Sequence, residues 1–474
     1  MHSLFSDDLK QLNALYQRIQ FSFIFLYGRY DTGKTRLVRE FCAGKRALFF
    51  SAREAVSSQQ LSAFWRDTVR SLQPAKTPAP FTDWKQAFAF LSDYSFTHRL
   101  VLVLDEFQSL MQHCDDFAEA FTAAVQHDFP AGKVFLIVTC SSPAYASHLM
   151  KEPAAAPFDC VTARASMGAL PFYTCQEFLA GYTPKEQLLL YGATGGLPSN
   201  LERLDCSCSA RENILSLFFY RDSPLLFAPQ TLLQRELREI STYNLLLEII
   251  SGGFTKLVDI AAKASMGTNK CAKYLNTLIS LGMIQKEFPA AGEVQKKVRY
   301  VFADHMARFW YRFVFPNLSA ILFGEGEALF DTYVLPSADE YLLPVFEQIC
   351  ADYLERLGNS EQAPFPYRHT GSWWCGGTKR EPFFRIPLVA VDEKHSVLGA
   401  CHCRQEPADT DCLDGLMRPL PLFEKKRRYY CIFSTSGFTA ALREEAGSRN
   451  NVWLIDLEDI APSESKNPGT HLLR

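Results

Sequence analysis

The sequence has no apolar run of the roughly 18 residues that a membrane-spanning helix needs, and it has no CxxC cysteine pair. Its N-terminal segment shows neither the basic nor the apolar part of a secretory leader. The fourteen cysteines are scattered, which favours reduced thiols in a cytoplasmic protein. Cys401, His402 and Cys403 stand close together, but adjacent strand residues point to opposite faces, so no zinc site is expected there.

An excess of charge of one sign is also missing. The net charge is −3, so any nucleic-acid contact has to come from a local basic face. Aromatic residues make up 13% of the chain, which argues against long disordered regions. A chain of 474 residues is too long for one hydrophobic core, and about two to four domains are expected.

The first part of the chain alternates apolar runs with helical patterns. Residues 21–27 are almost continuously apolar and end at a glycine, as a buried parallel strand does. Similar runs recur at 47–50, 100–104 and 134–138, separated by helical patterns at 34–42, 59–71, 84–94 and 117–127. This alternation predicts an α/β domain with a parallel sheet covered by helices on both faces.

A phosphate-binding motif follows the first run. It reads Gly28-Arg29-Tyr30-Asp31-Thr32-Gly33-Lys34-Thr35 and satisfies G-x-x-x-x-G-K-[ST] between a strand and a helix. Its glycines let backbone amides curl around a phosphate, and the next helix adds its positive end. Lys34 is expected to reach the β- and γ-phosphates, and the Thr35 hydroxyl to ligate Mg²⁺. The motif predicts an ATP site, although Asp31 is an unusual acid in an anion-binding loop.

An acidic pair stands at the end of the third apolar run. Asp105 is expected to hold Mg²⁺ through water, and Glu106 to orient and polarise the attacking water. The alternative is that these acids only cap the following helix.

Two further groups are candidates for contact with the γ-phosphate. The fourth run ends in Thr139 and Ser141, and either hydroxyl at that strand end can sense the phosphate. Arg164 is a candidate charge-stabilising arginine, in its own site or in that of a neighbouring molecule. An arginine on the solvated surface explains Arg164 equally well.

Beyond residue 204 the pattern becomes mostly helical. Residues 205–242 are expected to form a helical lid or linker. Residues 243–302 follow the order of a winged helix, which is helix, helix, helix and hairpin. Residues 303–474 begin helical and become α/β, with strands at 384–391, 397–403, 428–433 and 452–455.

The segment 243–302 is locally basic, with eight basic and four acidic residues and therefore a net charge of +4. Its second long helix is expected to enter a major groove of duplex DNA, while the hairpin meets phosphates. The residues concerned are Asn269, Lys270, Lys273, Lys296, Lys297 and Arg299. The competing interpretation is an interdomain spacer or a protein-docking module with a solvated basic face.

The order of these motifs resembles that of a known family, the archaeal-type P-loop ATPases of the AAA/STAND group. Members carry a winged helix and a C-terminal domain of nuclease-like ancestry. The resemblance rests on the P-loop and on residues 104–108, 141–142, 194–198, 309–313, 346–350 and 433–438. It implies a P-loop sheet (1–204), a lid or linker (205–242), a winged helix (243–302) and a restriction-endonuclease-like α/β domain (303–474). It also implies ATP binding and hydrolysis.

One departure from the family concerns the nuclease motif. The metal-binding carboxylates fall on Pro387 and Ala400, and the lysine falls on His402. Proline and alanine cannot ligate Mg²⁺, so the C-terminal domain is expected to be inactive as a nuclease. Glu347 keeps its carboxylate, and Asp392 and Glu393 lie near enough for a shifted alignment to involve them.

Together these patterns favour an ATP-driven switch that presents the winged helix and C-terminal domain to DNA or to a protein partner. A scaffold in which ATP is a structural ligand with negligible turnover is the alternative. An ATP-dependent nuclease is disfavoured, and a homo-oligomer is left open.

Overall fold

The computed structural model describes residues 5–18, 20–151, 157–291, 298–360, 363–367, 369–376, 383–418, 420, 422–424 and 426–460. These form two compact units. The first comprises Met1–Ala169 with Leu197–Ser199 and Ser280–Gly282, and the second comprises Leu170–Gly196, Asn200–Ile279 and Met283–Arg474. The first unit thus ends before residue 204, where the sequence suggests a boundary. The finer division at 242 and 302 stays a prediction.

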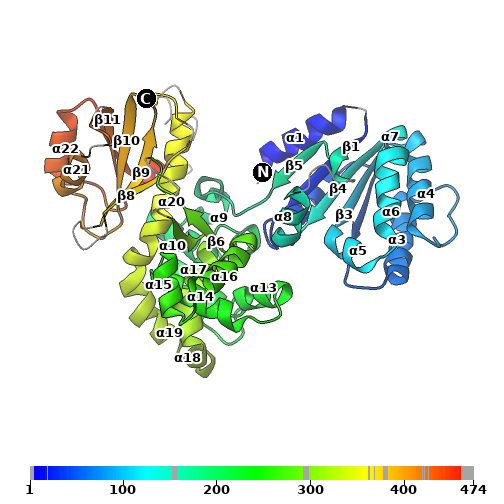
Figure 1. Ribbon diagram of the computed structural model, residues 1–474, viewed down its shortest axis with the longest axis horizontal. Coiled ribbons are helices and arrows are strands. Elements are labelled where there is room, and N and C mark those ends of the chain that lie inside the picture. The colour runs from blue at the N-terminus through cyan, green and yellow to red at the C-terminus, as the bar shows by residue number, and fades with distance from the viewer. Residues whose placement is uncertain are drawn as a thin grey trace. The chain divides into compact units, whose positions relative to one another are not determined.

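The first unit is built on a five-stranded parallel sheet with the order β2-β3-β4-β1-β5 (Figure 1). Its strands are β1 (Ser22–Tyr27), β2 (Ala47–Ser51), β3 (Leu100–Asp105), β4 (Val134–Cys140) and β5 (Ala163–Ser166). The predicted α/β fold with a parallel sheet is therefore confirmed. Strand β4 lies between β1 and β3, so the end of β4 separates the P-loop from the acidic pair.

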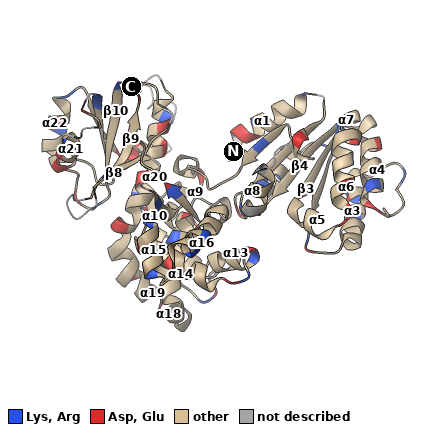
Figure 2. Ribbon diagram, in the orientation of Figure 1, with Lys and Arg blue, Asp and Glu red and all other residues tan. Residues whose placement is uncertain are grey.

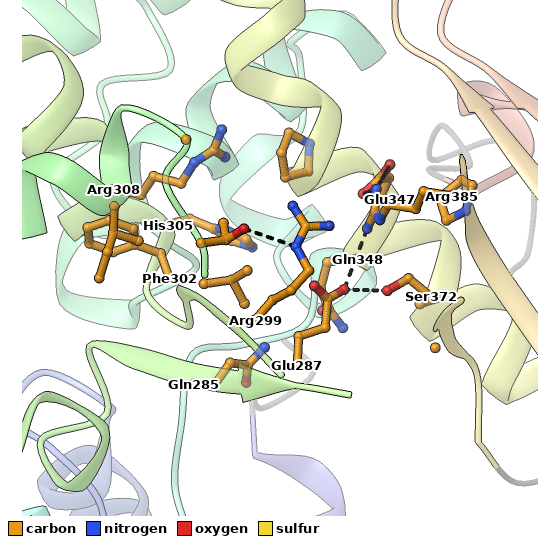
Figure 3. Close-up of a pocket in the computed structure, with 18 of the residues that line it drawn as sticks. Gln285, Glu287, Arg299, Phe302, His305, Arg308, Glu347, Gln348, Ser372 and Arg385 are labelled. Carbon is orange, nitrogen blue, oxygen red and sulfur yellow. Dashed lines mark hydrogen bonds and ion pairs between the residues drawn. The ribbon is translucent and has the colours of Figure 1, made fainter. Parts of the chain in front are cut away.

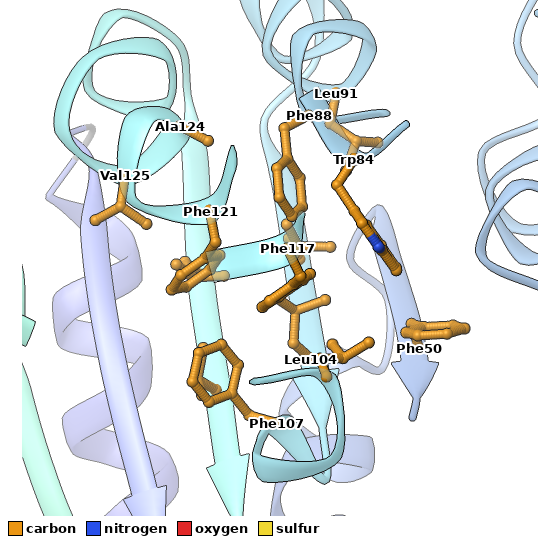
Figure 4. Packing of buried hydrophobic residues seen from close by; sticks show 14 of the residues in the cluster. Phe50, Trp84, Phe88, Leu91, Leu104, Phe107, Phe117, Phe121, Ala124 and Val125 are labelled. Atoms are coloured by element: carbon orange, nitrogen blue, oxygen red, sulfur yellow. The ribbon is translucent and has the colours of Figure 1, made fainter. Parts of the chain in front are cut away.

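Helices cover both faces of this sheet. They are α1 (Ser6–Gln17), α2 (Lys34–Cys42), α3 (Ser57–Leu72), α4 (Trp84–Thr97), α5 (Phe107–His113), α6 (Phe117–Ala123), α7 (Phe129–Ala131) and α8 (Pro143–Lys151). On one face, Tyr16 and Phe41 pack against Phe135 of β4. On the other, aromatic side chains of α4, α5 and α6 pack against one another and against β2 (Figure 4). Phe64 of α3 also packs against Phe50 of β2.

The second unit begins with a helical part. It contains α9 (Gln176–Leu179), α10 (Pro184–Thr194), α12 (Ala210–Phe218), α13 (Ala228–Glu236), α17 (His305–Phe309), α18 (Leu318–Phe323), α19 (Gly326–Leu329) and α20 (Ala338–Gly358). The short α11 (Pro198–Leu201) is shared between the units. Helix α20 packs on α10 and also on the second sheet, and so it joins the two parts of this unit.

The segment expected to be a winged helix contains α14 (Ser241–Ser251), α15 (Leu257–Lys263) and α16 (Thr268–Ser280). Strands β6 (Ile284–Glu287) and β7 (Arg299–Phe302) follow and pair antiparallel. Helix α16 buries Cys271, Leu275 and Leu278, which recur at helical spacing. The tip of the hairpin, with Lys296 and Lys297, lies outside the described residues.

The second sheet is mixed and has the order β12-β11-β10-β9-β8. Its strands are β8 (Gly371–Cys375), β9 (Phe384–Val391), β10 (His395–His402), β11 (Arg427–Ser434) and β12 (Val452–Asp456). Strands β10, β11 and β12 are parallel, whereas β9 is antiparallel to both of its neighbours. Helices α20, α21 (Thr410–Met417), α22 (Ala440–Gly447) and α23 (Leu457–Ile460) pack against it.

Lys and Arg are interspersed with Asp and Glu over both units (Figure 2), so small groups of charges decide what each surface can bind. None of the fourteen cysteines, all of which lie in the described part, forms a disulfide. Among the helices that the structure describes, none has both the length and the apolar character needed to cross a bilayer.

Candidate nucleotide site

The loop between β1 and α2 depends on glycine at two positions. Gly28 has a φ of +151° and Gly33 a φ of +86°, which L side chains rarely adopt. A Cβ on Gly28 would also lie 2.0 Å from the carbonyl oxygen of Met167. The Gly28 amide donates to the Cys140 carbonyl at the end of β4 (3.1 Å). Asp31 is exposed to solvent, which screens its charge.

Lys34 is buried at the start of α2, directly below this loop. Its ammonium donates to the carbonyl oxygens of Gly28 (2.6 Å) and Arg29 (2.7 Å). Burial lowers the pKa of Lys34, and the nearby carboxylates of Glu106 and Asp105 act in the opposite direction. The loop therefore holds a desolvated positive charge where its backbone curls, which is the charge that a bound phosphate would meet.

Asp105 is buried at the carboxyl end of β3. One carboxylate oxygen accepts from the Thr139 hydroxyl (2.5 Å), and the other accepts from the Ser51 hydroxyl (3.2 Å). Burial raises the pKa of Asp105, while the hydrogen bond from Thr139 acts in the opposite direction. Both partners are neutral donors, so no cation satisfies this carboxylate within hydrogen-bond distance among the described residues.

Glu106 connects three parts of the site. One carboxylate oxygen accepts from the Ser141 hydroxyl (2.6 Å). The other accepts from the Tyr30 hydroxyl (3.1 Å) and from the Gln108 side-chain amide. Its backbone has a φ of +57°, which is uncommon for a residue with a side chain and is found at functional sites. The P-loop, the end of β3 and the end of β4 thus meet at one carboxylate.

The structure brings together most of the residues that the sequence singles out. Lys34, Asp105, Glu106 and Ser141 lie at one edge of the sheet, and Thr35 follows Lys34 in the first turn of α2. Sequence reasoning missed the contacts of Ser51 and Gln108 and the role of Tyr30 in holding Glu106. Gln108 follows the acidic pair by two residues, but a side-chain amide after a strand has no specific signature.

Arg164 lies elsewhere on the sheet. It belongs to the edge strand β5, pairs in register with Phe25, and is exposed. Its guanidinium donates to the carbonyl oxygen of Phe158 (3.0 Å). In the described part of the chain, no hydrogen bond or ion pair joins it to Lys34, Asp105 or Glu106, and its catalytic role stays a prediction.

The residues expected to contact DNA divide into two groups. Asn269, Lys270 and Lys273 are exposed on α16. Arg299 of β7 is instead half-buried, and its Nε donates to the Thr255 hydroxyl (3.0 Å).

The carboxylate expected at the nuclease motif is engaged by an arginine. Both oxygens of Glu347, on α20, accept from Arg385 on β9 (2.7 and 2.9 Å). Asp392 lies in the β9–β10 turn, where it accepts from the backbone amide of Lys394 (2.7 Å) and contacts the His395 ring (2.9 Å). The described residues contain no group of three or more His, Cys, Asp or Glu side chains arranged to hold a metal ion.

A parallel sheet with G-x-x-x-x-G-K-T directly after one of its strands defines the class of P-loop NTPases. Within that class, residues 6–204 match a family described as an ATPase domain predominantly from Archaea. Residues 310–410 match a family of archaeal and bacterial proteins of unknown function. The chain therefore carries an archaeal-type ATPase domain followed by a domain of this second family.

The chain is also similar to individual proteins. An uncharacterized protein of Methanocaldococcus jannaschii is 26% identical over 82% of this chain and 83% of its own length. A Walker-type ATPase of Pyrococcus abyssi has a TM-score of 0.50 at 14% identity, over 66% of this chain and 96% of that one, which shows a shared fold. An ORC2 protein of Aeropyrum pernix, in ADPNP and ADP complexes, has a TM-score of 0.44 at 16% identity, over 68% and 94% of the chains.

Proposed function

We propose that this chain hydrolyses ATP at the P-loop of the first unit. The observation that carries the proposal is the position of Glu106, which is hydrogen-bonded both to Tyr30 of the P-loop and to Ser141 of β4. If ATP binds at the P-loop, a carboxylate at that point would lie beside its γ-phosphate. It is therefore suited to orient an attacking water.

The donor set near the P-loop fits Mg²⁺. Asp105 offers a buried carboxylate whose partners are neutral hydroxyls, and Thr35 offers a hydroxyl in the first turn of α2. Oxygen donors of this kind, completed by phosphate and water, are those that Mg²⁺ prefers. When bound, Mg²⁺ would neutralise part of the charge of the triphosphate.

In this proposal Lys34 exchanges partners when nucleotide binds. Its ammonium now donates to loop carbonyls, and it would turn to the β- and γ-phosphates. Glu106 acts as the base that polarises water. Ser141, its hydrogen-bond partner, senses whether a γ-phosphate is bound. Arg164 is proposed as a charge-stabilising residue that reaches a site only after rearrangement or in a neighbouring molecule.

The test compares phosphate release by the full chain with that of Glu106→Gln. We expect the substitution to lower kcat by about 100-fold or more, since a general base contributes roughly 10²–10⁴. The exposed Glu119→Gln, on α6, is the matched control and should keep the wild-type rate. A wild-type protein that binds ATP but turns over no faster than Glu106→Gln would instead favour ATP as a structural ligand.

We further propose that nucleotide state controls contact with duplex DNA through α16, whose Asn269, Lys270 and Lys273 are exposed. Lysine–phosphate contacts release counterions, so affinity should fall steeply with salt. The Lys270→Gln, Lys273→Gln double variant should weaken binding and flatten its salt dependence, and ATP and ADP should give different affinities. Salt-independent or absent binding would favour a spacer or protein-docking role.

We also propose that the C-terminal domain does not cleave DNA, because Arg385 occupies both oxygens of Glu347. Neither Pro387 nor Ala400 offers a metal ligand in its place. A cleavage assay on plasmid and linear DNA with Mg²⁺ or Mn²⁺ should show no cutting. Cutting that disappears in Glu347→Ala or Asp392→Ala would overturn this proposal.

A further inference from the structure

The second unit contains a cavity of about 730 Å³ that is separate from the P-loop. Strands β6 and β7, helices α17 and α20, and strands β8 and β9 all contribute to its lining. Cavities of this size take ligands as large as a nucleotide or a small drug. The lining mixes apolar side chains such as Val301, Phe302 and Pro344 with an unusual number of charged ones.

Five basic and four acidic residues line the cavity: Lys286, Arg299, Arg308, Arg312 and Arg385, and Glu287, Glu340, Glu347 and Glu355. The acids are already engaged. Arg385 lies 2.7 Å from Glu347 and 3.5 Å from Glu287. Glu340 faces Arg312 at 3.6 Å, and Glu355 faces His369 at 3.2 Å. The carboxylates therefore leave no free set of ligands for a cation.

Two guanidinium groups of the described lining form no close ion pair, although Glu287 and Glu347 act on the charge of Arg299 from a greater distance, as Glu347 and Glu340 do on that of Arg308. Among the described residues, neither Arg299 nor Arg308 has an acidic oxygen within 4 Å. Arg308 lies over the ring of Tyr341, 4.5 Å from its centre. Figure 3 shows Arg299 between His305 and Arg308 on one side and Glu347 and Arg385 on the other.

Several polar atoms in the same lining lack a hydrogen-bond partner among the described residues. They are Nη1 of Arg308, Nε of Arg385, Nδ1 of His305 and Oγ1 of Thr370. A buried polar atom without a partner is costly, and native proteins rarely keep several in one place. Burial and the nearby Arg308 lower the pKa of His305 to about 4, so its ring is neutral and adds no further charge.

We propose that this cavity binds the phosphate group of a small phosphate ester or of a phosphorylated nucleic-acid end. Guanidinium groups match the geometry of phosphate oxygens. A phosphate monoester carries a charge of about −1.5 to −2 at neutral pH, which more than offsets the net charge of +1 that the five basic and four acidic lining residues leave. A phosphate offers three acceptor oxygens to the two guanidinium groups, whereas a carboxylate offers only two. The apolar part of the lining receives the organic body of the ligand.

The test uses the full chain with Lys34→Ala, which is expected to weaken phosphate binding at the P-loop. Two probes are titrated by calorimetry: ribose 5-phosphate, and a 5′-phosphorylated thymidine tetranucleotide. Each has its dephosphorylated counterpart as reference. We expect at least one phosphorylated probe to bind about tenfold or more tightly than its reference, as charge-assisted hydrogen bonds require. Binding of the sugar phosphate alone identifies a small ester, and binding of the tetranucleotide alone identifies a nucleic-acid end.

Substitutions then locate the binding. Arg299→Gln and Arg308→Gln should each weaken the phosphorylated probe about tenfold or more. Arg443→Gln, an exposed arginine on α22, is the control and should change the affinity by less than about twofold. If Arg308→Gln does not fold, Arg299→Gln decides. The proposal is overturned if neither probe shows phosphate-dependent binding, or if binding survives substitution of these arginines. ATP turnover is measured separately, so failure here leaves the P-loop proposal standing.

Discussion

In the first unit the carboxylates of Asp105 and Glu106 accept hydrogen bonds from neutral hydroxyl and amide groups, whereas in the second unit Glu347 is bound by the guanidinium of Arg385. Neutral partners leave a carboxylate its negative charge, which suits it to a metal ion or a proton. An arginine cancels that charge. This difference supports the two proposals, which are a metal-bound triphosphate in the first unit and a phosphate group without a metal in the second.

The largest expected effect on this comparison comes from Lys34→Ala. Removing the ammonium below the P-loop should weaken ATP binding by about 100-fold, or about 2.7 kcal/mol. The reason is that the contact between the desolvated ammonium and the phosphates is lost. The measurement is the Kd of a fluorescent ATP analogue in the presence of Mg²⁺. Lys85→Ala, at an exposed position of α4, should leave the Kd unchanged. Equal affinities for Lys34→Ala and wild type would break the comparison.

Gly28→Ala tests the backbone of the P-loop. The new Cβ would meet the Met167 carbonyl at 2.0 Å and would force alanine into a φ of +151°. We expect a loss of about 2–3 kcal/mol in the free energy of unfolding of this unit, because alanine is strained in a backbone conformation that is sterically unfavourable for it. Urea unfolding measures it. Gly168→Ala is the control because its Cβ would meet open space without a positive φ. Similar stability of the two variants would contradict the geometry.

Glu347→Gln tests the other side of the comparison. It leaves the partly buried Arg385 with a weaker partner, and we expect a loss of about 2 kcal/mol, below the 3–5 kcal/mol of a fully buried pair because both side chains keep some exposure. Thermal unfolding of the second unit provides the readout. Glu340→Gln, whose side chain is 80% exposed, should cost no more than about 0.5 kcal/mol. If Glu347→Gln left the thermal stability of the second unit unchanged, the buried position of Arg385 would not depend on this carboxylate.

The smallest expected effect concerns Asp105→Asn. Burial raises the pKa of Asp105 in the folded state, so the folded protein binds this proton more tightly than the unfolded chain does. The contribution of Asp105 to the free energy of unfolding therefore falls as the pH rises from the pKa of this residue in the unfolded chain to its raised pKa in the folded protein. The asparagine variant should be more stable than wild type by about 1 kcal/mol at pH 7.5 and by less near pH 4.5, although it loses ATPase activity. A stability difference between the variant and wild type that stays constant with pH, or that changes in the opposite direction, would contradict the raised pKa of Asp105.

The sequence predicted the elements that have continuous apolar runs. Strands β1, β3 and β4 and the P-loop follow from such runs and from a fixed spacing of glycines. Strand β5 was missed, because its four residues alternate between partly buried and exposed and carry no apolar run. Strand β8, at the edge of the second sheet, was missed as well.

The candidate sites show the same limit. Asp105 and Glu106 stand out because a buried strand ends at them. The hydrogen bond from Tyr30 to Glu106 joins residues 76 positions apart and depends on the tertiary fold. The cavity of the second unit is lined by residues between positions 250 and 387, and no local sequence pattern indicates that its charged side chains lie together.

The most direct test of the P-loop proposal is a crystal structure of Glu106→Gln with ATP and Mg²⁺. The account predicts that the Lys34 ammonium leaves the carbonyls of Gly28 and Arg29 for the β- and γ-phosphates, with Asp105 and Thr35 beside the metal. A nucleotide bound elsewhere, or a Lys34 still held by those carbonyls while ATP occupies the loop, would contradict it.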